Sequence, residues 1–151
     1  MIICTPRTVF SKQFDVNGGP GERGDIEYKI MTEQGTLTWA GVTYEVRKHG
    51  PGSGYWSLED GDEVLADAQK PSPWHRKILV ETSTLKLELV PRSVFLRAFD
   101  VLESGQMVGS IEPAHALTRR AFLDFGPEVP EHIQLFCFWM VALMWRRARR
   151  K

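Results

Sequence analysis

The apolar segment near the C-terminus, Ile133 to Trp145, limits what this chain can fold into more than any other stretch. Its thirteen side chains carry no charge, and Gln134 is the only polar residue among them. A helix that is apolar on every face must be enclosed by protein or by lipid. As a helix this segment would span roughly 20 Å, whereas the hydrocarbon core of a bilayer is roughly 30 Å thick. The length therefore favours a buried core helix over a membrane span.

The residues on either side of this segment support the same interpretation. The cations that follow it are Arg146, Arg147, Arg149, Arg150 and Lys151. A C-terminal anchor would have to carry these charges across the bilayer, against the tendency of basic residues to stay on the cytoplasmic side. Pro127, Pro130 and Glu131 precede the segment, so acidic and basic residues lie at the helix ends that their charges stabilise. We predict a helix over about residues 131–147, with insertion of this helix into lipid as the alternative.

Most of the remaining chain has the pattern of short β-strands. In residues 84–90, the leucines alternate with charged side chains, which is the period of a strand with one buried face. Similar stretches recur at short spacing, separated by turn sequences such as Asp60-Gly61. This spacing predicts a meander that closes into a sandwich or barrel, in a single domain over residues 1–151. A curved sheet wrapped around the apolar helix would bury the apolar faces of both. The helix side chains expected in this core are Ile133, Leu135, Phe136, Phe138, Trp139, Val141, Leu143 and Trp145.

Composition bears on the compartment and on the class of partner. The 19 Lys and Arg residues balance the 19 Asp and Glu residues, so net charge gives no reason to expect a nucleic-acid partner. Because five of the 19 basic residues lie in the last six positions, a mildly acidic body precedes a basic tail. Cys4 and Cys137 are far apart, and Cys137 lies within the apolar segment, a usage typical of a reducing compartment. The N-terminal residues lack the apolar core of a secretory signal, so we expect a cytoplasmic protein.

No combination of residues predicts catalysis or metal binding. The histidines, His49, His75, His115 and His132, have neither the i, i+4 pairing nor the cysteine spacing of a zinc site. The glycine-rich stretches 17–21 and 50–54 lack the preceding strand and following helix of a phosphate-binding loop, so we interpret them as plain loops. The acidic residues 59–63 are interpreted as a hairpin turn with solvated carboxylates. We therefore expect no enzyme, no cofactor and no metal site.

Three stretches of the chain carry a family resemblance: EVLADAQKPSPWHRK (63–77), QMVGSIEP (106–113) and RRAFLDFGPEVPEHIQLFCFWMVALMWRR (119–147). In these stretches it resembles small bacterial members of the tubby C-terminal-like superfamily, which also contains tubby domains, phospholipid scramblases and LURP-one-related proteins. The resemblance implies a closed antiparallel barrel of about twelve strands, over residues 8–125, around a central hydrophobic C-terminal helix. It also implies phosphoinositide binding, as in tubby domains, or a role in lipid movement, as in scramblases. The calcium motif proposed for scramblases is not carried over, because Asp124, Glu128 and Glu131 are not clustered as calcium prefers.

Two basic segments are the candidate sites for an anionic ligand. In the first, Trp74, His75, Arg76 and Lys77 follow a proline-marked turn. They combine cations that attract phosphate with an aromatic ring suited to a lipid headgroup boundary. The second is the C-terminal tail, where Arg146, Arg147, Arg149 and Arg150 could hold anionic lipid. The alternatives are that Trp74 packs on the barrel rim and that both sets of cations are merely solvated.

These patterns together lead to an expectation about function. We expect a non-enzymatic binding or structural module, peripheral to membranes, with anionic phospholipid as its partner and no nucleic-acid partner. A membrane-inserted or scramblase-like protein that uses the C-terminal helix is the alternative, and a protein-interaction module is a further one.

Overall fold

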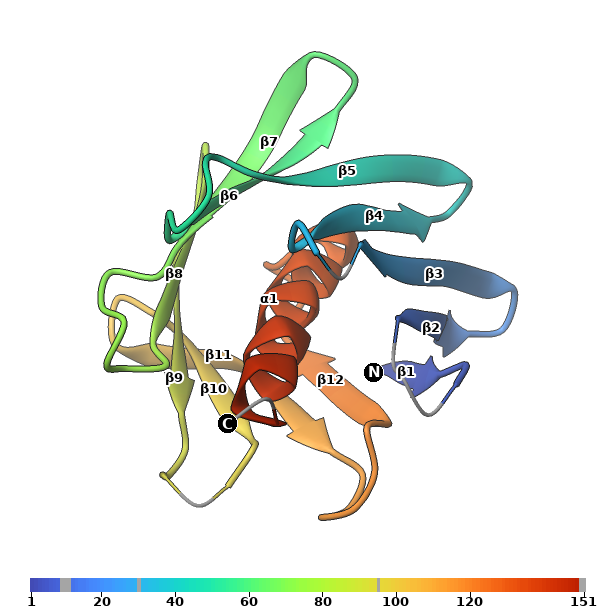
Figure 1. Ribbon diagram of the computed structural model, residues 1–151. Helices are drawn as coiled ribbons and strands as arrows, with labels where there is room; N and C mark the ends of the chain where they lie inside the picture. Colours follow the sequence, from blue (N-terminus) through green and yellow to red (C-terminus); the bar gives the residue numbers. More distant parts are fainter. Residues whose placement is uncertain (9–11, 30, 95, 150–151) are drawn as a thin grey trace.

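The computed structural model describes residues 1–8, 12–29, 31–94 and 96–149. Within these residues the chain forms twelve antiparallel strands and one helix (Figure 1). The strands are β1 (Ile2–Pro6), β2 (Gln13–Gly19), β3 (Glu22–Lys29), β4 (Gln34–Trp39), β5 (Val42–Lys48), β6 (Tyr55–Asp60), β7 (Glu63–Gln69), β8 (Ile78–Thr82), β9 (Lys86–Pro91), β10 (Phe99–Glu103), β11 (Gln106–Pro113) and β12 (Ala121–Phe125), and the helix is α1 (Glu131–Arg149).

The strands form a closed barrel. Each strand pairs with its neighbour in the sequence, and β1 pairs with β12 through a register that places Ile2 opposite Leu123 and Cys4 opposite Ala121. Closure leaves no strand edge with a row of unpaired backbone groups. The predicted closed antiparallel barrel of about twelve strands is confirmed.

The first strand lies outside the range 8–125 in which the sequence places the barrel. β1 begins at Ile2, and its buried side chains, Ile2 and Cys4, alternate with less buried ones. The range is therefore too short at its N-terminal side. A strand of five residues carries little periodicity, and the partner that makes β1 part of the barrel, β12, comes last among the strands.

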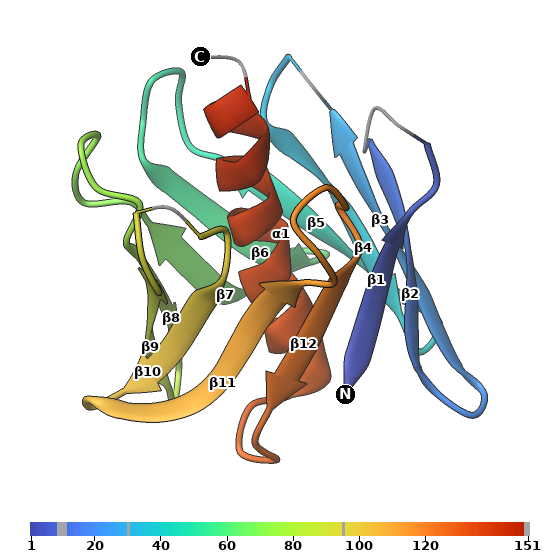
Figure 2. The same cartoon turned by 90° about the horizontal axis from the view of Figure 1, so that it is seen from below.

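The helix runs through the inside of the barrel, along its axis (Figure 2). Every residue from Ile133 to Trp145 is buried, and the eight side chains predicted for the core are at most 5% exposed. Phe138 packs edge-on against Phe14 of β2, with 5.2 Å between ring centroids. Trp139 stacks on Tyr28 of β3 at 4.4 Å, and the Tyr28 hydroxyl donates to the Trp139 carbonyl oxygen at 2.7 Å. The prediction of a buried core helix is confirmed.

The segment before the helix sets where α1 begins. The carbonyl oxygen of Pro130 accepts hydrogen bonds from the backbone N–H groups of Ile133 and Gln134, both at 3.0 Å. The side chain of Gln134, the one polar residue of the apolar segment, is buried and donates to the Val129 carbonyl oxygen at 2.9 Å. A buried amide with a partner avoids the desolvation cost of an unpaired one. The helix continues to Arg149, two residues beyond the predicted end at 147. The arginines of its last turn therefore lie outside the apolar interior.

Candidate functional site

The two ends of the barrel differ, because alternate connections of an antiparallel meander lie on the same side. One end carries the connections β1–β2, β3–β4, β5–β6, β7–β8, β9–β10 and β11–β12, together with the C-terminal end of α1 (Figure 2). We call it the loop end. The other end carries the short hairpin turns and the connection from β12 to α1. We call it the hairpin end.

Charge is segregated between these two ends. Among the described residues, the loop-end connections contain nine Lys or Arg residues and a single carboxylate, Glu33. The basic residues are Arg7, Lys12, Lys70, Arg76, Lys77, Arg92, Arg97, Arg119 and Arg120, and α1 adds Arg146, Arg147 and Arg149. The hairpin-end connections contain Asp62 and Glu128 and, in the part of the chain that the structure describes, no Lys or Arg. A formally neutral protein thus has one strongly positive end.

Carboxylates on the barrel wall neutralise part of this charge. Arg92 lies 2.8 Å from a carboxylate oxygen of Asp100 and 2.5 Å from one of Glu112. Lys77 lies 3.0 Å from Glu88, and both side chains are more than 40% exposed. Exposed pairs of this kind contribute little to stability, but they reduce the charge that Lys77 and Arg92 present to a ligand.

Two other arginines are held by backbone carbonyls, which satisfy their N–H groups without neutralising them. Arg76 donates to the carbonyl oxygens of Ser93 at 2.7 Å and Leu96 at 3.5 Å. Arg97 donates to three carbonyl oxygens of the β11–β12 connection, the shortest at 2.6 Å to Thr118, and lies over the Trp145 ring. Within the described residues, neither guanidinium has a carboxylate within ion-pair distance.

The surroundings of Arg97 disfavour its positive charge. Burial lowers the pKa of its guanidinium below the ordinary value, and the nearby charge of Arg119 lowers it further. An arginine nevertheless stays protonated in proteins. Arg97 therefore keeps its positive charge at the loop end although burial and Arg119 disfavour that charge. An anionic ligand would stabilise it.

Glu33 ties the end of the helix to the barrel. Its carboxylate accepts two hydrogen bonds from the Arg147 guanidinium, both at 2.7 Å, and one from Lys48 Nζ at 2.6 Å. The indole N–H of Trp56 donates to the Glu33 carbonyl oxygen at 3.0 Å. The hydrogen bonds from Arg147 are the largest cause of a Glu33 pKa lowered to about 2. Arg147 is thus a structural residue as much as a candidate ligand-binding one.

A cavity of about 320 Å³ brings the two predicted basic segments together. Its lining includes Trp74, His75 and Arg76 from the β7–β8 connection and Met144 and Arg147 from α1. Nothing in the sequence indicated that these segments, far apart in the chain, would share one cavity. Their meeting depends on α1 leaving the barrel beside the β7–β8 connection.

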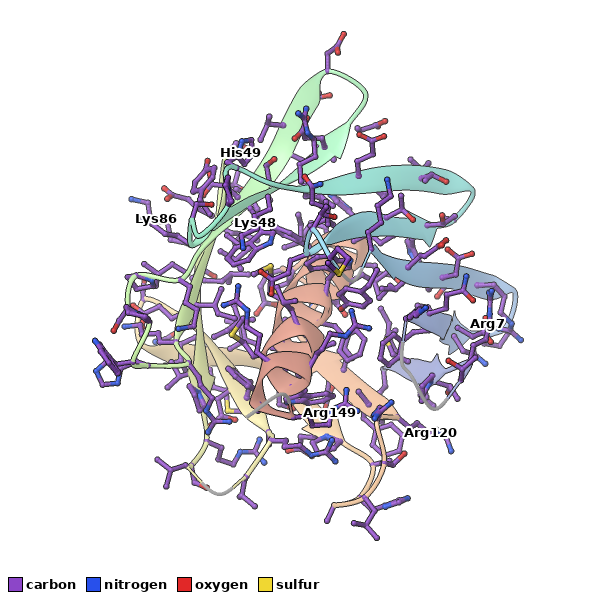
Figure 3. All side chains as sticks on the ribbon, viewed as in Figure 1. Arg7, Lys48, His49, Lys86, Arg120 and Arg149 are labelled. Atoms are coloured by element: carbon purple, nitrogen blue, oxygen red, sulfur yellow. The ribbon has the colours of Figure 1, made fainter. Side chains whose placement is uncertain are left out.

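The remaining predicted site residues are placed differently. Lys77 lines a neighbouring groove but pairs with Glu88. Arg146 lies over the Tyr28 ring, 4.9 Å from its centroid, and Arg149 is exposed at the end of α1 (Figure 3). Arg150 lies outside the described residues. Trp74 is 88% exposed, so the alternative that it packs on the barrel rim is wrong.

The loop end also presents large apolar side chains to solvent. They lie on four different connections: Met31, Trp74, Val94, Leu96 and Leu117. Single exposed apolar residues are common on protein surfaces. Their position among the cations of one end is the unusual feature, and together these two properties define the candidate site.

No protein-family model, curated protein or solved structure matches this chain. The resemblance to the tubby C-terminal-like superfamily therefore stays a prediction. In the described part of the chain, no helix is both long and apolar enough to cross a membrane.

Proposed function

We propose that this protein is a peripheral, non-catalytic binding module that attaches to anionic phospholipid membranes through its loop end. The observation that carries the proposal is the segregation of charge: nine basic residues and one carboxylate in the described loop-end connections, with three more arginines at the end of α1. Basic residues near an anionic lipid surface each contribute roughly 1 kcal/mol to binding. Several basic residues acting together give a useful affinity for an anionic surface.

The apolar side chains favour a lipid surface over other polyanions. Met31, Val94 and Leu117 are aliphatic or thioether side chains, exposed beside the cations. Interfaces with DNA are more polar than this, because phosphates and base edges offer such side chains little. A bilayer accepts both kinds of group, since anionic headgroups lie directly above hydrocarbon.

The enclosure of α1 favours peripheral attachment over insertion of the helix. Phe136, Phe138 and Trp139 would have to contact lipid in a helix-inserted protein, but all three are fully buried within the barrel. Exposing them would require the barrel to open.

Flotation with lipid vesicles tests the proposal. We expect the protein to float with phosphatidylcholine vesicles that contain phosphatidylserine, to stay unbound with phosphatidylcholine alone, and to dissociate in high salt as the charges are screened. Arg149→Glu should weaken binding by roughly 30-fold, since it removes one positive charge and adds a negative one, about 2 kcal/mol in total.

Lys86→Glu is the matched control for this variant. It makes the same change in net charge, but Lys86 opens β9, after the hairpin-end turn, and its side chain is 85% exposed (Figure 3). It should bind vesicles like the unmodified protein. Equal weakening by both variants would mean that only net charge matters, and would contradict a loop-end site. No flotation with either lipid mixture would leave a protein partner as the better hypothesis.

A further inference from the structure

The loop end exposes large apolar side chains that binding through charge alone does not require. The exposed fractions are 95% for Leu117, 94% for Met31, 88% for Trp74 and 82% for Val94. An electrostatic contact with headgroups needs cations alone. Large apolar side chains grouped on one rim are a feature of surfaces that bury them against a partner.

Two neighbouring connections, β7–β8 and β9–β10, line a groove in this surface. The groove has a volume of about 480 Å³. Its apolar lining includes Trp74, Val90, Pro91 and Val94, and its cations are Arg76 and Lys77. A tryptophan flanked by basic side chains is the combination found where proteins meet the boundary between headgroups and hydrocarbon.

The groove is held in shape by hydrogen bonds between and within the two connections. Arg76, from β7–β8, donates to the carbonyl oxygens of Ser93 and Leu96 in β9–β10. The backbone N–H of Trp74 donates to the Ser72 hydroxyl at 3.2 Å, and that of Leu96 donates to the Ser93 hydroxyl at 3.1 Å. The backbone of the two connections is thus held by hydrogen bonds before any partner arrives, which lowers the ordering cost of binding.

We infer that the loop end docks by insertion: Trp74, with Val94 and Leu96 beside it, enters the interfacial and upper acyl-chain region of an anionic bilayer. The cations of the same rim, Arg76 among them, then lie at the level of the phosphates. Leu117, on the β11–β12 connection, provides a further apolar contact, so that the barrel axis stands steeply to the membrane plane. This inference rests on the proposed function, and it adds a depth and an orientation to it.

The tryptophans of the protein make the inference directly measurable. The chain has five, and four of them, Trp39, Trp56, Trp139 and Trp145, are at most 6% exposed. Trp74 is the exception, so a change in tryptophan emission on vesicle binding reports on the tip of the β7–β8 connection. On binding to vesicles with phosphatidylserine, we expect the emission to shift to shorter wavelength, iodide in the water to lose its quenching, and lipids brominated on the acyl chains to quench.

The variant Trp74→Phe provides the matched control. It should fold like the unmodified protein by circular dichroism and bind anionic vesicles more weakly. At a vesicle concentration where it is bound, it should lose the emission shift and the quenching by brominated lipids. Flotation of the unmodified protein without quenching by brominated acyl chains would overturn insertion while leaving the proposed function intact. Failure to float at all would overturn the proposed function, and insertion with it.

Discussion

Replacing Phe138 with Asp is expected to abolish the folded barrel. The ring of Phe138 is fully buried at the centre of the molecule, between Phe14 at 5.2 Å and Trp145 at 6.0 Å between ring centroids. Removing a buried phenylalanine side chain alone costs about 3–5 kcal/mol, and an unpaired carboxylate in its place adds a further desolvation cost. The total stability of a domain is about 5–15 kcal/mol. Far-UV circular dichroism and the yield of soluble protein measure the loss.

Two variants separate this effect from a general sensitivity to mutation. Phe138→Leu keeps an apolar side chain at the site and should retain the fold, with a stability loss of roughly 1–2 kcal/mol. Leu117→Asp places the same charge on an exposed loop-end residue and should leave the stability nearly unchanged. A Phe138→Asp protein with a cooperative thermal transition would show that the helix is not enclosed by the barrel.

Replacing Glu33 with Gln is expected to destabilise the protein by about 2 kcal/mol at neutral pH, the usual worth of hydrogen bonds to a charged group. The side chain of Glu33 is only 16% exposed, and its carboxylate is the shared partner of Arg147 and Lys48. The variant would leave two partly buried cations facing a neutral amide. Urea unfolding at neutral pH measures the difference.

The pH dependence of this difference follows from the lowered Glu33 pKa. Because the carboxyl titrates near 4.5 when unperturbed and at about 2 in the folded protein, the stabilisation is complete above pH 4.5 and is lost as the pH falls toward 2. The two proteins should therefore converge in stability in acid. Glu88→Gln is the control, since its pair with Lys77 is exposed and should be worth less than about 1 kcal/mol. A stability gap that is unchanged from pH 7 to pH 2 would contradict the role given to Glu33.

The core of the fold could be predicted from the sequence because its signals are local. The apolar segment that includes Phe138 and Trp139 has too few residues to span a bilayer, and it has cations beyond one end. Those two facts favour enclosure by protein over insertion into lipid, and short alternating strands can form a sheet that encloses the segment. β1 escaped prediction because its strand character depends on pairing with β12, and short isolated strands carry little periodicity.

The candidate site could be predicted only in part, for a related reason. Trp74 and Arg76 could be predicted because they lie in one short segment of the chain with another basic residue, Lys77. Arg97 and Arg120 are separated from that segment in sequence, and join it only because every second connection of the barrel reaches the same end. That rule applies to any antiparallel meander. Once the strands are assigned, the summed charge of the side chains on alternate connections therefore predicts the positive end.

The direction in which the barrel faces a membrane can be measured with a dye attached to one engineered cysteine at a time. The native thiols of Cys4 and Cys137 are fully buried, and burial raises the pKa of Cys137 to about 12, so neither competes for labelling in the folded protein. Leu117→Cys places an environment-sensitive dye at the loop end, and Val64→Cys places it in β7 beside the hairpin end.

On addition of vesicles with phosphatidylserine, the dye at position 117 should brighten and shift to shorter wavelength, while the dye at position 64 stays in water. A response at position 64 instead of position 117, or an equal response at both, would show that the loop end is not the surface that meets the membrane.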